Sequence, residues 1–238
     1  MEEIKTGLTK LKLSGMTTCL KILEETRKIY ELSLFDGLKL LIQAETDHRK
    51  VHRLERLIKN ATFRYQASME ELTFSTSRGI EQSQILYLAT CNYVHKGEAI
   101  LITGAAGCGK SFLATALGMQ ACKLDYTVIY SNLQKLMTRL KIAKLEGNTI
   151  SLFDKLAKTE LLIIDDFGLF PLDAQQQLDF MEIIEDRHGR KATIIASQLP
   201  VANWFDIFKE ETLADAILDR IVHTSHRIEL KGESLRKK

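Results

Sequence analysis

Apolar residues in the first part of the chain recur at helical spacing. Met16, Leu20 and Leu23 follow one another at i, i+4 and i+7, which places them on one face of a helix. Ser33 and Asp36 resemble a capping box, because a hydroxyl and a carboxylate three residues apart can satisfy the amide groups at a helix start. Further apolar positions continue the same spacing: Leu34, Leu38, Leu41, Ile42, Val51, Leu54 and Ile58. We therefore expect residues 1–70 to form a small domain of about three or four helices, whose apolar stripes bury against each other or against the next domain.

From about residue 97 the pattern changes to short apolar runs that alternate with helical segments. Apolar runs of this length predict strands, and the segments between them are long enough for helices. The predicted strands cover residues 99–102, 127–130, 161–164, 193–196 and 226–230, and the predicted helices cover residues 110–121, 133–145, 174–187 and 213–222. Strands that are apolar at nearly every position are typical of a parallel sheet with helices on both faces. The fold class is therefore α/β, preceded by a helical N-terminal domain.

The composition is typical of a soluble globular protein. With 238 residues, of which 45% are apolar and 27% charged, the chain has enough material for one ordinary domain and a smaller one. No apolar run approaches the roughly 18 residues that a membrane-spanning helix needs, and the first residues lack the apolar region of a signal peptide. Neither a disulfide framework nor a zinc site is expected, because the four cysteines are scattered and form no C-x-x-C pair: Cys19, Cys91, Cys108 and Cys122. These features predict a cytoplasmic protein.

Positive charge gathers in one stretch, although the whole chain is nearly neutral. The 33 Lys and Arg residues and 31 Asp and Glu residues leave a net charge of +2, whereas six basic residues and one acid, Glu55, fall between His48 and Arg64. Such a run predicts DNA-phosphate contacts without sequence preference, and a solvated helix face or an interdomain contact explains it equally well. The residues Arg-Lys-Lys at 236–238 form a second basic cluster. The candidates for DNA contacts, all but Lys50 near one helical face, are Arg49, Lys50, Arg53, Arg56 and Lys59.

A glycine-rich motif follows the first predicted strand. Residues 104–111 match the phosphate-loop pattern G-x-x-x-x-G-K-[ST], and a glycine-rich turn without a ligand is the alternative. Glycines let backbone amides wrap around phosphate oxygens, and the helix that opens at Lys110 directs its N-terminal amides at the anion. Lys110 is expected to reach the β- and γ-phosphates, and the Ser111 hydroxyl to bind Mg²⁺. The predicted nucleotide-binding residues are Gly104, Ala105, Ala106, Gly107, Cys108, Gly109, Lys110, Ser111 and Phe112.

Polar residues follow two other predicted strands. Asp165 and Asp166 follow the third strand, and Ser197 and Gln198 follow the fourth. The carboxyl ends of parallel strands face the crevice in which α/β sheets bind ligands. We expect Asp165 to hold Mg²⁺ through its water shell and Asp166 to orient or deprotonate the attacking water; an exposed pair of acids is the alternative. Ser197 or Gln198 reaches toward the γ-phosphate or the water, or simply begins the turn before Pro200.

Arg220 lies just before the last predicted strand. An arginine there can project into the nucleotide site of a neighbouring subunit and neutralise transition-state charge, and a solvated helix arginine is the alternative. Together these pieces resemble an AAA+ ATPase. More closely, the chain resembles the IstB family of ATPases, which assist the transposition of IS21-type insertion sequences and are related to DnaC-type helicase loaders. The residues that carry this resemblance are 161–168, 196–201 with Trp204, 213–223, 227–236, and Leu13 to Met16 with Glu45, Arg49 and Arg53.

The resemblance covers essentially the whole chain. It implies a five-stranded parallel sheet in the order 5-1-4-3-2, an AAA+ domain over residues 71–238 and no C-terminal lid domain. The cofactors it implies are ATP and Mg²⁺, and the partners are duplex DNA bound without sequence preference, a cognate transposase and further copies of the chain in an ATP-dependent oligomer. The helical domain at 1–70 would make contacts with DNA, a partner or other subunits. The roles it implies are phosphate and Mg²⁺ binding for Lys110, Ser111 and Asp165, water activation for Asp166, a sensor for Gln198 and an arginine finger in trans for Arg220.

Two departures from the wider AAA+ pattern affect these expectations. Asp166 replaces the usual Glu and is one methylene shorter, so hydrolysis is expected to be slow. The chain ends soon after the last strand, which leaves no lid arginine to assign and makes Arg236 the substitute candidate. Two other functions stay open: a replicative helicase loader that acts on a hexameric helicase, and a nucleotide-gated DNA-binding module with negligible hydrolysis.

Overall fold

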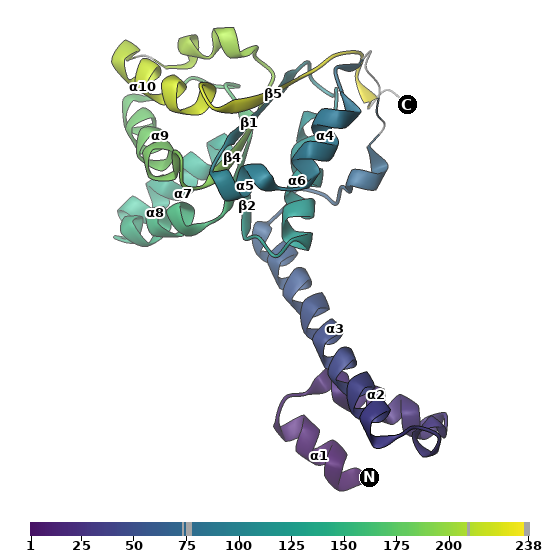
Figure 1. The fold of residues 1–238 in the computed structure, drawn as a ribbon. Helices are drawn as coiled ribbons and strands as arrows, with labels where there is room; N and C mark the ends of the chain where they lie inside the picture. The colour runs from purple at the N-terminus through teal and green to yellow at the C-terminus, as the bar shows by residue number, and fades with distance from the viewer. Residues whose placement is uncertain (73, 75–77, 209, 236–238) are drawn as a thin grey trace. The chain divides into compact units, whose positions relative to one another are not determined.

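A computed structural model of the chain describes residues 1–72, 74, 78–208 and 210–235 (Figure 1). The chain divides into two compact units, Met1–Arg56 and Leu57–Lys238. The sequence analysis places the division at residue 70, whereas the structure places it within a long helix. The residues that follow this helix already contact the sheet, since the Thr62 hydroxyl donates to the Tyr130 carbonyl at 3.2 Å. They therefore belong with the second unit.

Helices joined by short turns form the first unit. Their bounds are α1 (Glu2–Lys10), α2 (Ser14–Glu25), the 3₁₀ turn η1 (Lys28–Tyr30) and α3 (Leu34–Ala61), which continues into the second unit. At the start of α3 the Ser33 hydroxyl accepts the Asp36 N–H at 3.2 Å and donates to the Asp36 carboxylate at 2.6 Å. The predicted helix start is confirmed at this position.

Glu45 joins α2 to α3 inside the first unit. Its carboxylate is buried and accepts the backbone N–H groups of Gly15 and Met16 at 2.8 and 3.2 Å. These amides lie in the first turn of α2, where a carboxylate is favourable for the helix dipole. Arg49 donates to the same carboxylate from its Nε at 2.7 Å and, as the largest cause, holds the pKa of Glu45 below its usual value. A side chain at Gly15 would meet the Ala44 carbonyl at 2.5 Å, so the two helices touch backbone to backbone.

The expectation that the apolar stripes of this region bury is only partly correct. Leu20 and Leu23 of α2 are buried, but on α3 the exposed fractions are 75% for Leu34, 47% for Leu38 and 57% for Ile42. A unit of this size has little material with which to surround a long helix. The first half of α3 therefore carries an exposed apolar face.

The second unit contains one parallel sheet. Its order is β2-β3-β4-β1-β5, which is the predicted order read from the other edge. Every pairing between neighbouring strands is parallel. The strands, each slightly longer than its predicted run, are β1 (Ala99–Gly104), β2 (Val128–Asn132), β3 (Leu161–Phe167), β4 (Ala192–Ser197) and β5 (Ser225–Leu230).

The helices of the second unit include four that the sequence predicts and three that it does not. The predicted ones are α6 (Lys110–Lys123), α7 (Leu133–Leu145), α9 (Ala174–Arg187) and α10 (Glu211–Val222). The others are α4 (Gln82–Ala89), α5 (Asn92–Lys96) and α8 (Thr149–Lys158). The 3₁₀ turn η2 (Met69–Glu71) precedes α4, and η4 (Val201–Asn203) and η5 (Phe205–Ile207) lie between β4 and α10. Within the described part of the chain, none of the helices is long and apolar enough to cross a membrane.

Side chains of successive strand residues point to opposite faces of the sheet, and each face packs against a different set of helices. Leu162 and Ile164 point into a core shared with α7 to α10, whereas the Ile163 side chain lies against α6 at Gly118. Figure 1 shows α7 to α10 on one side of the sheet and α4 and α6 on the other. A strand in a sheet that is covered on both faces therefore needs apolar residues at nearly every position.

A buried arginine holds the helical layer to the sheet. Arg187, at the end of α9, is 1% exposed. Its Nε donates to the Thr193 hydroxyl at 3.1 Å, and its Nη1 donates to the carbonyls of Leu156 and Thr159, the second at 2.8 Å. Its Nη2 donates to the Ala192 carbonyl. The acceptors are neutral, so burial lowers the pKa of this guanidinium to about 9. It therefore stays charged at neutral pH.

Candidate nucleotide-binding site

The glycine-rich motif forms the loop between β1 and α6. Gly104, Gly107 and Gly109 have φ angles of 145°, 79° and 104°, which side chains other than glycine rarely adopt. A side chain at Gly104 would meet the Leu230 carbonyl at 2.2 Å, and one at Gly107 would meet the Ser234 Oγ at 2.1 Å. The loop is thus shaped both by its own backbone and by the segment that follows β5.

Lys110 lies inside this loop. Its side chain is buried, and its Nζ donates to the carbonyls of Gly104 and Ala105 at 2.7 and 2.8 Å. The ammonium is thereby held against the first two residues of the loop, and a lysine attracts phosphate as a point charge. The phosphate-binding role of Lys110 stays a prediction from the sequence.

Asp165 is held between two donors at the end of β3. The carboxylate is 1% exposed, and its Oδ1 accepts the Asp166 N–H at 2.9 Å. Its Oδ2 accepts the Tyr130 hydroxyl, a residue on β2. Burial, followed by this carboxylate, raises the pKa of Tyr130, which keeps the phenol a hydrogen-bond donor at neutral pH.

Tyr65 connects Ser111 with the acidic strand. Burial raises the pKa of the Tyr65 phenol, and hydrogen bonds with the Ser111 and Thr115 hydroxyls act in the opposite direction. The negative charge of Asp165 also raises this pKa. The ring stacks on Phe112, with centroids 6.4 Å apart. Ser111 and Asp165 therefore both act on the Tyr65 phenol.

The donor set offered by Ser111 and Asp165 fits Mg²⁺. It consists of a hydroxyl and a carboxylate, which are the oxygen ligands that this ion takes. Among the described residues, no group of three or more His, Cys, Asp or Glu side chains could hold a metal ion. A magnesium ion that also binds nucleotide phosphates keeps several waters, so it needs only one or two ligands from the protein.

Asp166 is turned toward β2. Its φ is 57°, and the β3–β4 register shifts between Ile164 and Phe167. The Asn132 side-chain nitrogen donates to the Asp166 Oδ2 at 2.6 Å. The Asn132 Oδ1 accepts the Gln134 N–H at 2.9 Å and so caps α7. One asparagine thus restrains the acid and starts the next helix.

Ser197 and Gln198 take different positions at the end of β4. Ser197 is fully buried, donates to the Phe167 carbonyl at 2.7 Å and accepts the Leu199 N–H at 3.1 Å. Its hydroxyl is therefore used to join β4 to β3. Gln198 is exposed at the carboxyl end of β4, whose neighbours are β1 and β3. Of the two candidates, only Gln198 presents its side chain outside the sheet.

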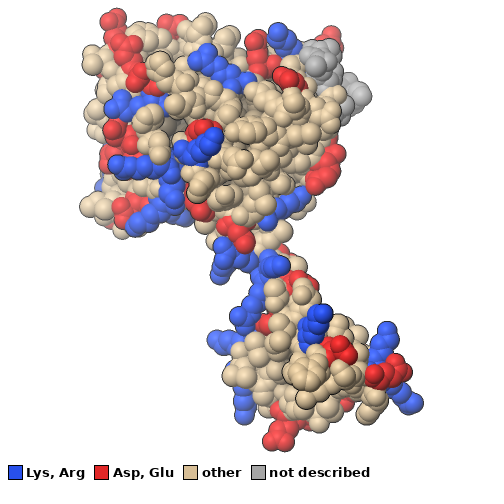
Figure 2. Space-filling model, in the orientation of Figure 1, with Lys and Arg blue, Asp and Glu red and all other residues tan. Residues whose placement is uncertain are grey.

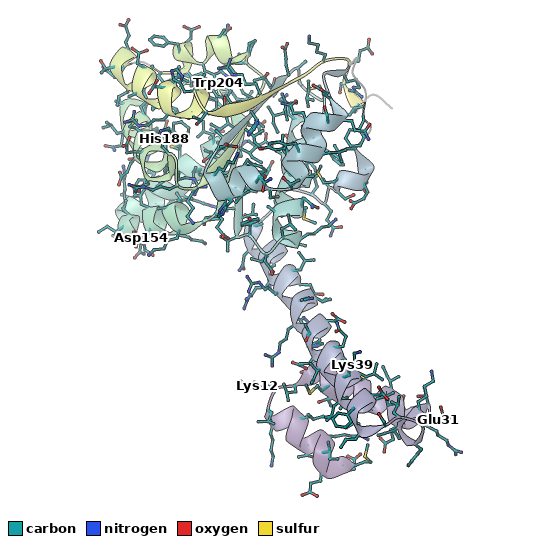
Figure 3. The ribbon with its side chains drawn as sticks, viewed as in Figure 1. Lys12, Glu31, Lys39, Asp154, His188 and Trp204 are labelled. Atoms are coloured by element: carbon teal, nitrogen blue, oxygen red, sulfur yellow. The ribbon has the colours of Figure 1, made fainter. Side chains whose placement is uncertain are left out.

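Arg220 is not brought to the phosphate loop of its own chain. It lies near the end of α10, beside the first residues of β1 and β4, at the strand edge opposite to the loop. Its Nε pairs with the Glu185 carboxylate and its Nη1 donates to the Ala216 carbonyl at 2.8 Å. His188, labelled in Figure 3, contacts the Arg220 carbonyl through its Nδ1 at 3.0 Å.

The candidate DNA-contact residues lie on α3. Figure 2 shows Lys and Arg side chains along this helix. Arg49 is paired with Glu45, as described above, with 65% of its side chain exposed. The others, which are exposed, are Lys50, Arg53, Arg56 and Lys59. The second basic cluster at 236–238, with the substitute lid candidate Arg236, lies outside the described residues.

The sequence analysis did not find three residues of this site. Tyr65, Tyr130 and Asn132 contact Ser111, Asp165 and Asp166 from segments without a motif. The sequence offered one indication that Asn132 belongs to the site, namely that it is a polar residue just after the second predicted strand. An apolar cavity of about 230 Å³ beside the loop was also missed; its lining includes Leu72, Ile80, Phe112, Leu113, Leu230 and Leu235.

Comparison with known proteins identifies the family. The sequence profile of the IstB-like ATP binding protein family matches residues 6–238. The chain belongs to this family. Over 230 residues it is 39% identical to an insertion sequence ATP-binding protein of Sinorhizobium fredii, covering 97% of this chain and 94% of that protein. Over 235 residues it is 30% identical to the ATP-binding protein of insertion sequence IS232 of Bacillus thuringiensis, covering 99% and 94%.

Solved structures share the fold of this IstB-like chain. The crystal structure of DnaI has a TM-score of 0.60 at 18% identity and covers 70% of this chain and 92% of that chain. The DnaC helicase loader has a TM-score of 0.54 at 20% identity and covers 74% and 99%. The chain thus shares its fold with DnaI and with the DnaC helicase loader.

Proposed function

We propose that this IstB-like protein binds and hydrolyses ATP, assembles with ATP on duplex DNA and recruits or stimulates the transposase of an IS21-type insertion sequence. The observation that carries the proposal is the glycine loop between β1 and α6 with the buried Lys110 ammonium inside it, together with the buried Asp165 carboxylate at the end of β3. Membership of a family of insertion-sequence ATP-binding proteins supports the biological setting.

The nucleotide would be held by the loop and its neighbours. Backbone amides of residues 104–111 and the Lys110 ammonium bind the phosphates. Ser111 and Asp165 would hold Mg²⁺, which when bound supplies charge neutralisation at the phosphates. The apolar cavity of about 230 Å³ beside Phe112 and Leu113 suits the flat, apolar faces of a purine base.

Hydrolysis would depend on Asp166, Gln198 and Arg220. Asp166 orients the attacking water or accepts its proton, and Gln198 lies at the strand end from which a side chain can contact the γ-phosphate or that water. Arg220, at the opposite strand edge, would act on the nucleotide of a neighbouring copy. A contact made only when ATP is present favours the assembled state and couples ATP to assembly.

Assembly would let weak DNA contacts act together. Repeated basic surfaces on one duplex add by avidity, and the α3 residues Arg53, Arg56 and Lys59 are the candidates for these contacts. Changing Arg53 and Arg56 to Gln is expected to weaken binding of a duplex at low salt, measured by fluorescence anisotropy. Unaltered binding would place the DNA contacts elsewhere. Arg49 is better left intact, because its loss would free the buried Glu45 carboxylate.

The decisive experiment is Lys110→Ala, with Lys123→Ala as its control at the other end of α6. We expect the first variant to lose ATP binding, followed with a fluorescent ATP analogue, and ATP-dependent assembly, followed by analytical ultracentrifugation. The control is expected to retain both. Normal ATP-dependent assembly of the Lys110→Ala variant would refute the role of the loop.

A second candidate function is a nucleotide-gated DNA-binding module with negligible hydrolysis. The hydrogen bond from Asn132 to Asp166 favours it, because it engages the carboxylate that would activate water. Phosphate release measured with and without DNA distinguishes the two. The helicase-loader alternative rests on likeness of fold alone; a pull-down with a hexameric helicase against one with the transposase decides that question.

A further inference from the structure

A basic cleft lies beside the nucleotide site, on the side of β2. It has a volume of about 480 Å³ and is lined by residues of three segments: 62–64, the end of β2 at 130–132, and the start of α7. Asp166 contributes the remaining wall. The basic residues that line it, Arg64, Lys135 and Arg139, define what we call the basic cleft.

The sequence brings these cations together in two ways. Lys135 and Arg139 are four residues apart on α7, which places them on the same face of the helix. Arg64 lies three residues beyond the end of α3. Its segment is tied to β2 by the Thr62–Tyr130 hydrogen bond and by the contact of the Phe63 ring with the Tyr130 ring, with 6.3 Å between centroids. Burial raises the pKa of Tyr65 and of Tyr130, and the positive charge of Arg64 acts against this rise in both.

The charge of the basic cleft is unbalanced. Among the residues that the structure describes, no carboxylate is recorded in an ion pair with Arg64, Lys135 or Arg139. Three cations face one anion, Asp166, so the lining carries a net charge of +2. Asp166 is in turn engaged by the Asn132 amide. A concave surface with one sign of charge concentrates counter-ions of the other sign.

We propose that the basic cleft binds phosphate groups of a nucleic-acid backbone. Two arginines and a lysine are the side chains that hold phosphates, and the Thr62 and Ser131 hydroxyls and the Asn132 side chain add polar groups to the lining. The phosphates of ATP are an unsuitable occupant, since the glycine loop already provides their site.

An acidic protein segment fits the basic cleft less well than a nucleic acid does. Protein interfaces are anchored by aromatic and aliphatic side chains in pockets, and the lining offers only Phe63 and the Tyr130 ring as apolar surface. Backbone phosphates need no such anchor. The inference rests on the proposed function for the presence of DNA, and it assigns that DNA a second contact surface, separate from the candidate residues on α3.

The test compares two double variants that remove equal charge. The cleft variant is Lys135→Gln with Arg139→Gln. The control is Lys141→Gln with Lys155→Gln, two exposed lysines on α7 and α8 that do not line the cleft. Binding of a fluorescent duplex by the full chain is measured by anisotropy over a range of salt concentrations, with and without a non-hydrolysable ATP analogue.

The cleft variant is expected to bind the duplex at least tenfold more weakly, and the slope of log affinity against log salt to fall by about 2, one for each lost phosphate contact. The control is expected to stay within twofold of the unmodified protein. Equal losses in both variants, or no loss in the cleft variant, would overturn the inference. So would intact DNA binding with lost self-association, which would identify an acidic group of another copy as the occupant.

The DNA-binding measurements made without the ATP analogue distinguish a failure of this inference from a failure of the proposed function. A protein that fails to bind ATP but whose cleft variant loses DNA affinity contradicts the proposed function and supports the basic cleft. If the protein binds and hydrolyses ATP and both double variants bind DNA normally, the result supports the proposed function and contradicts DNA binding by the basic cleft. An unmodified protein that binds no duplex under any condition contradicts both.

Discussion

The Asn132 side-chain nitrogen donates to the Asp166 carboxylate at 2.6 Å, and the Asn132 oxygen caps α7 at the same time. The residue therefore has two separable tasks. A serine at this position keeps an oxygen for the cap but is too short to reach Asp166, whereas an alanine loses both groups.

Asn132→Ser is expected to raise the rate of ATP hydrolysis several-fold, because Asp166 becomes free to contact water, with little change in stability. Asn132→Ala is expected to raise the rate similarly and to lower the free energy of unfolding by about 1 kcal/mol through the lost cap. Phosphate release and thermal unfolding measure the two effects. A slower rate in the serine variant would mean that Asn132 itself assists hydrolysis.

Arg220, the arginine proposed to act on the nucleotide of a neighbouring copy, forms an ion pair with Glu185 in its own chain. Arg220→Ala is expected to keep ATP binding and to lose hydrolysis, since binding uses the loop and hydrolysis uses the neighbour. The control is Arg190→Ala, which changes an exposed arginine three residues after the end of α9, the helix that carries Glu185. An unchanged rate in the Arg220 variant would refute the assignment.

Glu185→Gln examines the same pair from its other side. Without the carboxylate, Arg220 is held less firmly within its own chain and is more available to a neighbour. ATP-dependent assembly is expected to occur at several-fold lower protein concentration, as followed by analytical ultracentrifugation. Assembly that requires more protein would show that the pair holds α9 and α10 in the shape needed for assembly.

Gly107 offers a test of the segment that follows β5. The Leu235 N–H donates to the Gly107 carbonyl at 2.9 Å, and a side chain at Gly107 would collide with Ser234. Gly147 has a similar φ, 73° against 79°, with nothing within 4 Å of the added carbon. Alanine at either position is expected to cost about 1 kcal/mol of stability for the left-handed backbone.

The two glycine variants should differ in nucleotide binding. Gly107→Ala is expected to weaken binding of a fluorescent ATP analogue more than tenfold, because the loop and residues 234–235 have to move apart. Gly147→Ala is expected to leave binding unchanged. Equal affinities in the two variants would show that the contact with Ser234 does not shape the loop.

Arg187 provides a test of stability. Arg187→Met leaves the Leu156, Thr159 and Ala192 carbonyls without their buried donor, so the free energy of unfolding is expected to fall by about 3 kcal/mol or more. Chemical denaturation measures this loss. Arg187→Lys is expected to recover only part of it, because an ammonium cannot match the fork of a guanidinium.

The pH dependence of this effect has a definite sign. The folded-state pKa of about 9 lies below that of an unperturbed arginine, so the folded protein binds fewer protons between the two pKa values and its stability rises with pH there. Below about pH 9 the group is charged in both states. The difference between Arg187 and Arg187→Met is therefore expected to be constant from pH 6 to 8.

The elements that depend on local pattern were predictable from the sequence. Apolar runs such as 161–164 indicate buried parallel strands, and the motif at 104–111 specifies a backbone shape through its glycines. Asp165 and Asp166 follow the apolar run in the sequence, and their role in a site there stays a prediction. Short helices such as α5 were missed because five residues carry too little periodicity to recognise.

The sequence by itself determined the strands, the loop and the acidic strand end, because each depends on residues that are neighbours along the chain. Only the tertiary structure decided that Asn132 meets Asp166 across 34 positions and that Arg220 pairs with Glu185. It also decided that Leu34 on α3 stays exposed. Contacts of this kind depend on strand register and on which helix faces pack together, and these are properties of the whole packed domain.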